Sequence, residues 1–214
     1  IRADYGLDKP FPVQLGIYLG NVVRQDFGYS FFFNSSVTSL IAERLPATLL
    51  LVFTAQIFAF VIGVVLGVVS ARRPHGLLSH FVTLLALFGY SAPVFWTGIM
   101  LLISLSLMLP LFPVAGMIDV TLIDAPLWRQ YLSVAHHLFL PALTLASIFL
   151  ALYSRLCRAS MLEVLGADYI RTARAKGLSE HDTVYRHALK NSLGPVVTLA
   201  GLQFSAVVSG AVLV

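Results

Sequence analysis

The chain has 214 residues, of which 58% are hydrophobic and 11% are charged, and its formal net charge is +4. Soluble domains carry about 25% charged residues, so this composition excludes a disordered chain or a coiled coil and argues against a soluble domain. The single cysteine, Cys157, excludes a disulfide-stapled module. Four runs without Asp, Glu, Lys or Arg are 27, 45, 25 and 24 residues long. A membrane-crossing helix needs about 20 apolar residues, so we predict an all-α integral membrane protein with several spans.

Residues 1–44 precede the first long apolar run. Within them, residues 13–23 form a short apolar segment, which we expect to be a helix lying in the membrane interface. Five aromatic residues follow between Phe27 and Phe33, and such clusters are typical of the headgroup level.

The first predicted span covers Leu45–Ser70, with Pro46 in the first helical turn, where proline is tolerated. Small residues recur every four positions along it. Such a stripe lets helix backbones approach closely in lipid, so we expect it to pack against another helix. Its members are Ala55, Ala59, Gly63, Gly67 and Ala71.

Three further spans are predicted along the chain. The second covers Phe81–Leu109, and Pro93 near its middle is expected to kink it. The third covers Leu138–Leu156, with Pro141 in its first turn, and the fourth begins at Pro195 and reaches the end of the chain.

The distribution of Lys and Arg predicts the orientation of these spans. Of the 14 basic residues, seven lie within 155–194 and two within 72–80, but only one lies within 110–137. Cytoplasmic loops carry the excess of basic residues, so 72–80 and 155–194 are predicted to be cytoplasmic. Residues 1–44 and 110–137 are then external. The domain prediction is therefore an external segment, 1–44, followed by a transmembrane domain, 45–214, that includes a cytoplasmic loop, 158–194.

This cytoplasmic loop carries the start and stop signals of two short helices. The first helix is expected over 167–176, and Gly177 is placed as a glycine that ends a helix with a positive φ angle. Ser179 resembles an N-cap, with an acidic residue three positions later. The second helix is expected to stop at Gly194-Pro195.

This helical pair has three interpretations: a solvated loop, a DNA-binding helix-turn-helix, or a docking element for a cytoplasmic partner. Membrane spans tether it within a few residues on both sides, which argues against nucleic acid. Capped helices favour the docking element, since a partner that moves the protein must push on a rigid unit.

Two stretches of this loop resemble a known family. The runs DYIRTARAKGLSE from Asp168 and RHALKNSLGP from Arg186 are similar to the signature loop of ABC importer permeases: Glu-Ala-Ala, three residues, Gly, nine residues, Ile-x-Leu-Pro. Aligned on Gly177, Ala173 matches the second alanine and Leu189 matches the leucine. The departures from the signature resemble the dipeptide/oligopeptide subfamily; they are Arg171, Thr172, His187 and Lys190.

Three other stretches carry the same resemblance: RLPATL from Arg44, DFGYS from Asp26 and SAPVF from Ser91. The resemblance implies a type I ABC importer permease with about six spans, so one span is expected before Ile1 and one after Val214. It also implies a bacterial inner-membrane location and alternating-access transport of peptides, with nickel or glutathione as alternative cargoes.

The implied partners are a second homologous permease subunit, two ATP-binding subunits or one fused ATPase chain, and an external substrate-binding protein that docks on 1–44 and 110–137. The chain has no phosphate-binding GxxxxGK[ST] motif. We therefore expect ATP and Mg²⁺ to be held by the ATPase subunits. We also expect no catalytic, cofactor-binding or metal-binding residue on this chain, because the adjacent His136 and His137 and the six-residue spacing of His181 and His187 are poor metal-ligand patterns. The resemblance implies that the first helix of the loop couples to the ATPase, through Ala167, Asp168, Tyr169, Arg171, Thr172, Ala173, Arg174 and Gly177.

The predicted spans contain no Asp, Glu, Lys or Arg, apart from the cytoplasmic end of the third span at Arg155. Ion-coupled secondary transporters place such groups within the membrane, so this class is disfavoured, as is an intramembrane enzyme, for which no motif is present. Neutral polar residues of the spans either line the translocation pathway or hydrogen-bond between helices. They are Gln56, Tyr90, Ser91, Ser104, Thr144, Ser147, Gln203 and Ser205.

Overall fold

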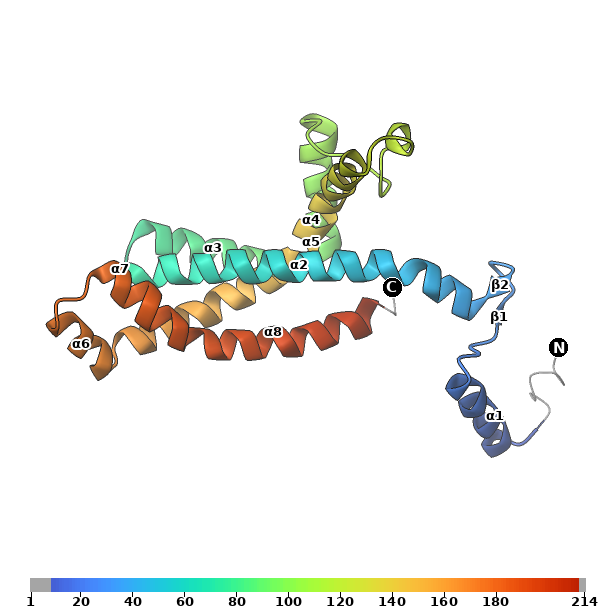
Figure 1. Cartoon of the computed structure of the whole chain (residues 1–214), viewed down its shortest axis with the longest axis horizontal. Coiled ribbons are helices and arrows are strands. Elements are labelled where there is room, and N and C mark those ends of the chain that lie inside the picture. Colours follow the sequence, from blue (N-terminus) through green and yellow to red (C-terminus); the bar gives the residue numbers. More distant parts are fainter. Residues whose placement is uncertain (1–8, 212–214) are drawn as a thin grey trace. The chain divides into compact units, whose positions relative to one another are not determined.

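The computed structural model describes residues 9–211, except for the side chains of Tyr90 and of residues 205–211. The chain divides into two compact units, Ile1–Leu49 and Leu50–Val214, and each is described by itself. Helices make up most of both units, as predicted for an all-α protein (Figure 1).

The first unit contains helix α1 (Phe11–Val23) and a short antiparallel hairpin of β1 (Tyr29–Ser30) and β2 (Ser35–Ser36). Helix α1 confirms the predicted short helix, and it has no buried residue. In the hairpin, the Tyr29 hydroxyl donates a hydrogen bond to Asn34 Oδ1 at 2.6 Å, and Asn34 adopts a positive φ of 50°. The placement of α1 and of the exposed aromatic residues in a membrane interface stays a prediction.

Helix α2 (Val37–Arg72) begins eight residues before the predicted start at Leu45. Ser36 explains this start, because its hydroxyl accepts the Ser39 backbone N–H at 3.1 Å, as an N-cap does. Pro46 therefore lies inside the helix, and the prediction of a first-turn proline is wrong. The helix continues because a proline removes only one backbone hydrogen bond, and transmembrane helices tolerate this loss.

The second predicted span is broken rather than merely kinked. It consists of α3 (Leu77–Ser91) and α4 (Val94–Leu102), the latter continuing as a π-helical turn, η1 (Ile103–Met108). The helix direction bends by 108° between Leu77–Gly89 and Val94–Met108. Ala92 and Pro93 are both extended, with ψ angles of 132° and 134°, because the residue before a proline avoids the helical region.

Helix α5 (Leu127–Leu165) follows a single 3₁₀ turn, η2 (Val120–Leu122). It begins well before the predicted start at Leu138, so Pro141 lies inside it and the prediction of a first-turn proline is wrong here too. Residues 127–137 contain neither glycine nor proline, so nothing interrupts the helix once it begins after Pro126.

The last part of the chain contains α6 (Asp168–Ala175), α7 (Glu180–Asp182), a π-helical turn η3 (Thr183–Ala188) and α8 (Leu189–Ala211). From Glu180 to Ala211 these elements follow one another without a break. The predicted stop at Gly194-Pro195 is therefore wrong, because one missing N–H at Pro195 does not end a helix that has tertiary contacts on both sides of it.

Two described helices, α2 and α5, are long and apolar enough to cross a membrane, and the bent pair of α3 with α4 and η1 is a third candidate. Helix α8 covers the start of the fourth predicted span, whose last residues lie outside the described part of the chain. The number of four spans stays a prediction.

The core of the second unit lies where α2, α5 and α8 pack. All five residues of the predicted small-residue stripe in α2 are buried. An added Cβ atom at Gly63 would lie 2.7 Å from Tyr153 Cβ of α5, and one at Gly67 would lie 2.6 Å from Cys157 Cβ. The predicted close approach of two helices along this stripe is confirmed.

Candidate functional site

The turn after α6 has the geometry that the loop sequence predicted. Gly177 has a φ of +84°. Its N–H donates to the Arg174 carbonyl at 2.9 Å, and the Leu178 N–H donates to the Ala173 carbonyl at 3.3 Å. These two bonds form a Schellman motif, in which a residue with positive φ ends the helix. Gly177 is therefore required by the backbone conformation of this turn.

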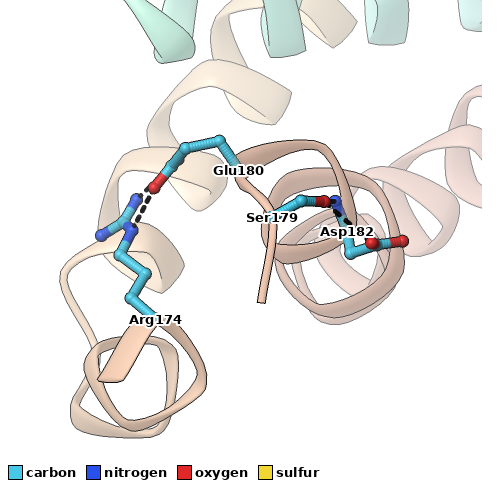
Figure 2. Close-up of polar contacts among 4 residues, drawn as sticks. All are labelled: Arg174, Ser179, Glu180 and Asp182. Carbon is cyan, nitrogen blue, oxygen red and sulfur yellow. Dashed lines mark hydrogen bonds and ion pairs between the residues drawn. The ribbon is translucent and has the colours of Figure 1, made fainter. Parts of the chain in front are cut away.

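Ser179 caps the next helix, as predicted. Its hydroxyl accepts the Asp182 N–H at 3.0 Å and donates to Asp182 Oδ2 at 2.8 Å (Figure 2). The acid thus binds the capping hydroxyl, whereas in a full capping box it would bind the backbone N–H of the cap. Helix α7 therefore begins at Glu180, two residues after Leu178, which completes the turn that ends α6.

An ion pair connects the two sides of the turn. Arg174 Nε lies 2.7 Å from Glu180 Oε1, and Arg174 Nη2 lies 3.3 Å from Glu180 Oε2 (Figure 2). The Arg174 and Glu180 side chains are 40% and 64% exposed, so the pair contributes at most about 1 kcal/mol. Its two-point geometry nevertheless restricts the angle between α6 and α7. Arg174, expected to contact the ATPase, instead forms an ion pair within the chain with Glu180, an acid that the sequence analysis did not single out.

Two contacts anchor α6 to the rest of the second unit. Ile170 is fully buried in the core cluster that also contains Met161 and Val184. The Tyr169 hydroxyl accepts a hydrogen bond from Asn191 Nδ2 of α8 at 2.9 Å. Sequence reasoning missed Ile170 and Asn191, although Ile170 is the single large aliphatic residue of a polar helix and thus a signal of burial.

The opposite face of α6 is exposed and polar. Asp168 and Arg171 form an ion pair at 3.5 Å, with side chains 96% and 74% exposed, and Thr172 and Lys176 are also exposed. Ala167 and Ala173 are half-buried. Seven of the eight predicted coupling residues lie on α6 or immediately before it, and Gly177 forms the turn after it. The arrangement is a rigid, anchored projection suited to docking.

The structure describes the side chains of six of the eight predicted pathway residues. Gln56 is 9% exposed and accepts a hydrogen bond from the Tyr153 hydroxyl at 3.4 Å, which joins α2 to α5. The Ser104, Thr144 and Ser147 hydroxyls bond carbonyls of their own helices. Gln203 is half-buried and Ser91 exposed; the side chains of Tyr90 and Ser205 lie outside the described ones. A pathway-lining role stays a prediction for all eight.

The segment predicted to dock an external binding protein contains a hollow of about 680 Å³ between residues 110–113 and the start of α5. Asp119 lies at its edge. The Thr121 backbone N–H, at 2.9 Å, and then the Thr121 hydroxyl, at 2.8 Å, both donate to Asp119 Oδ1 and hold the pKa of this carboxyl below its usual value, with a smaller contribution from His137. Among the described residues, no group of three His, Cys, Asp or Glu could hold a metal ion.

Comparison with known proteins gives a family and several relatives. Residues 63–214 match the family described as binding-protein-dependent transport system inner membrane component. The chain is 40% identical over 229 residues to the dipeptide transport system permease protein DppB of Escherichia coli (strain K12), covering 100% of this chain and 68% of that protein.

Two other relatives have similar identities. The oligopeptide transport system permease protein AppB of Bacillus subtilis (strain 168) is 40% identical over 98% of this chain and 65% of its own length. The di/tripeptide transport system permease protein DppB of Pseudomonas aeruginosa (strain UCBPP-PA14) is 41% identical over 97% of this chain and 66% of its own length. The chain thus spans about two thirds of the length of these relatives.

Proposed function

Because the chain belongs to the family of binding-protein-dependent transport system inner membrane components, we propose that it is the membrane-spanning permease subunit of an ATP-driven importer of peptides. The observation that carries this proposal is the capped turn around Gly177, which presents an exposed polar helix on a buried anchor. The names of three relatives support peptides as the cargo; nickel and glutathione are the alternatives.

In this proposal α6 is the coupling helix and docks into an ATPase subunit. Exposed Arg171 and Lys176 supply positive charge for acidic groups of the partner, and Tyr169 supplies an aromatic contact. The Gly177 turn and the Arg174–Glu180 pair keep α6 at a fixed angle to α7. A displacement of α6 reaches α8 through buried Ile170 and through the Tyr169–Asn191 hydrogen bond. Alternating access follows when this displacement moves the spans.

The other components of the importer are separate polypeptides. ATP and Mg²⁺ are held by two ATP-binding subunits, because this chain lacks a phosphate-binding loop motif. A second homologous permease completes the pathway, and an external binding protein delivers the peptide to segments 1–44 and 110–137. The location is the bacterial cytoplasmic membrane, with 72–80 and 155–194 on the cytoplasmic side.

The test is transport by the full importer reconstituted in liposomes, with labelled dipeptide supplied through the external binding protein. Uptake should require ATP on the side of the membrane that carries the ATPase subunits, and the binding protein on the opposite side. Excess unlabelled peptide should compete, whereas nickel and glutathione should not. Uptake that persists without ATPase subunits would rule out an ATP-driven importer. Competition by nickel or glutathione, but not by peptide, would show that one of these compounds is the cargo.

The coupling role of α6 is tested by Arg171→Gln, with Arg73→Gln as a matched control. Both residues are exposed arginines in predicted cytoplasmic segments, but Arg73 lies outside the turn. Loss of one interface arginine costs about 1–2 kcal/mol, so R171Q should weaken ATPase binding roughly fivefold to thirtyfold. Equal effects of R171Q and R73Q in a pull-down of the ATPase would argue against docking through α6.

A further inference from the structure

A hollow of about 210 Å³ lies between α3 and α5. Three residues of α3 and five of α5 line it, and none of them is acidic. Two are arginines, Arg155 and Arg158, one helical turn apart on α5. Two guanidinium groups beside one small hollow are matched in charge and shape by an anionic oxygen ligand.

The hydrogen bonds of Arg158 are incomplete. Its Nη1 donates to Thr83 Oγ1 and its Nη2 to the Pro74 carbonyl, both at the long distance of 3.4 Å. Its Nε is buried and has no acceptor among the described residues. A buried donor without an acceptor is costly, and native structures usually provide one. This atom therefore indicates an acceptor that the described chain does not contain.

Arg155 also favours an anionic ligand in this hollow. It has neither an ion pair nor a hydrogen bond with any described residue, and it is exposed. Two positive charges about one turn apart repel each other, and a shared anion would remove that repulsion. The hollow thus combines one unused guanidinium with one that is only partly used.

The surroundings of the hollow identify the source of the anion. Arg155 begins the segment predicted to be cytoplasmic, and the apolar side chains of Phe81, Leu85 and Leu162 are exposed nearby on α3 and α5. An exposed apolar surface beside a basic hollow at this level corresponds to the boundary between acyl chains and headgroups. Basic pockets between transmembrane helices on the cytoplasmic side suit anionic headgroups.

We propose that this hollow binds the phosphate headgroup of an anionic phospholipid from the cytoplasmic leaflet. Arg155 and Arg158 hold the phosphate oxygens, and the acyl chains lie along the exposed apolar face of α3. Such a lipid would connect α3 to α5 next to residues 73–76, which join α2 to α3. The inference is independent of the cargo and of the coupling role of α6.

The test is lipid binding to the intact importer, purified in neutral detergent and titrated with phosphatidylglycerol or phosphatidylcholine under native mass spectrometry. The variants are Arg155→Gln, Arg158→Gln and the control Arg73→Gln. R155Q removes no hydrogen bond to a described residue, so it tests the site even if R158Q fails to fold. Each hollow variant should weaken phosphatidylglycerol binding roughly tenfold, while R73Q stays within about twofold of the unmodified protein.

The outcomes separate the two sources of phosphate. Tight binding of phosphatidylglycerol but not phosphatidylcholine, unaffected by millimolar inorganic phosphate, supports a lipid site. Displacement of the lipid by inorganic phosphate would instead assign the hollow to a free anion and overturn the lipid assignment. Unchanged binding in R155Q, or an equal loss in R73Q, would show that the hollow does not hold the headgroup and would refute the proposal.

Discussion

The contact between α2 and α5 makes the effect of a single added methyl group at Gly67 predictable. In Gly67→Ala the new Cβ would lie 2.6 Å from Cys157 Cβ, 2.9 Å from the Ser154 carbonyl oxygen and 3.0 Å from Cys157 Sγ. Carbon atoms in contact prefer about 3.5–4.0 Å. The first two neighbours are a carbonyl oxygen and the first side-chain atom of a helix, so neither can turn away. The two helices must therefore separate locally.

The size of the effect follows from two opposing contributions. Overpacking of this kind costs about 1–3 kcal/mol, while replacing a mid-helix glycine by alanine stabilises a helix by about 0.8–1 kcal/mol. The control is Gly201→Ala in α8, where an added Cβ meets nothing within 4 Å. The difference between the two variants isolates the clash at about 1–3 kcal/mol, or about 2–12 °C in Tm.

The assay is thermal unfolding of the intact importer in detergent. Samples are heated, and the fraction that remains folded is measured by size-exclusion chromatography. G67A should have the lower Tm of the two variants. The double variant G67A/C157G removes the Cys157 Cβ and Sγ atoms and should recover part of the loss, with a coupling energy above about 0.5 kcal/mol. Equal Tm values for G67A and G201A, or no recovery in the double variant, would refute the close-approach reasoning.

Three further predictions concern the turn, its anchor and the external segment. Gly177→Val should uncouple ATP hydrolysis from transport, because a β-branched residue is strained at φ +84°. Gly177→Asn should retain more transport, because asparagine tolerates that conformation. Equal transport activities of the two variants would count against a role of the backbone conformation. Tyr169→Phe removes the acceptor for Asn191 and should raise the hydrogen-exchange rate of α6, reflecting a loss of about 0.5–1.5 kcal/mol, while exchange in α1 stays unchanged. Because the pKa of Asp119 is lowered in the folded loop, its carboxylate stabilises the loop above the ordinary aspartate pKa, and that contribution is lost as the pH falls through the folded value. The protection factors at 119–122, which correct the exchange rates for the intrinsic slowing of amide exchange in acid, should therefore fall as the pH is lowered, and Asp119→Asn should remove this pH dependence.

The sequence predicts best where one residue type suits only one geometry. The four-residue spacing of Gly63 and Gly67 favours a close helix contact, and the structure has it. Gly177 and Ser179 end one helix and begin the next, as their conformational and hydrogen-bonding preferences require. These are local rules, so a single sequence is enough to apply them.

The prolines show where local rules fail. Pro46, Pro141 and Pro195 were each expected near a helix end, yet all three lie inside helices. The cost of one lost hydrogen bond is local, whereas the packing that offsets it at Pro141 and Pro195 comes from distant segments; the residues around Pro46 are exposed. Pro93 does break its span, because Ala92 before it also leaves the helical conformation.

The candidate site also has one part that local sequence predicts and one part that it does not. The exposed face of α6 is predictable from its polar composition, and it carries Asp168 and Arg171. The partners that anchor or restrain α6 are Asn191 and Glu180, at sequence separations of 22 and 6 residues from Tyr169 and Arg174. Many polar residues compete for such pairings, so only a three-dimensional structure identifies them.

The break at Ala92 and Pro93 restricts what can surround it in a bilayer. Helix α3 has 15 residues and is about 22 Å long, short of the roughly 30 Å thickness of the hydrocarbon core. The first N–H groups of α4 have no acceptor within their own helix, and no side chain that the structure describes caps them. Acyl chains offer no hydrogen bonds to such groups. Within a bilayer, the break at Ala92 and Pro93 would therefore need polar acceptors from water, from another polypeptide or from a side chain outside the described ones.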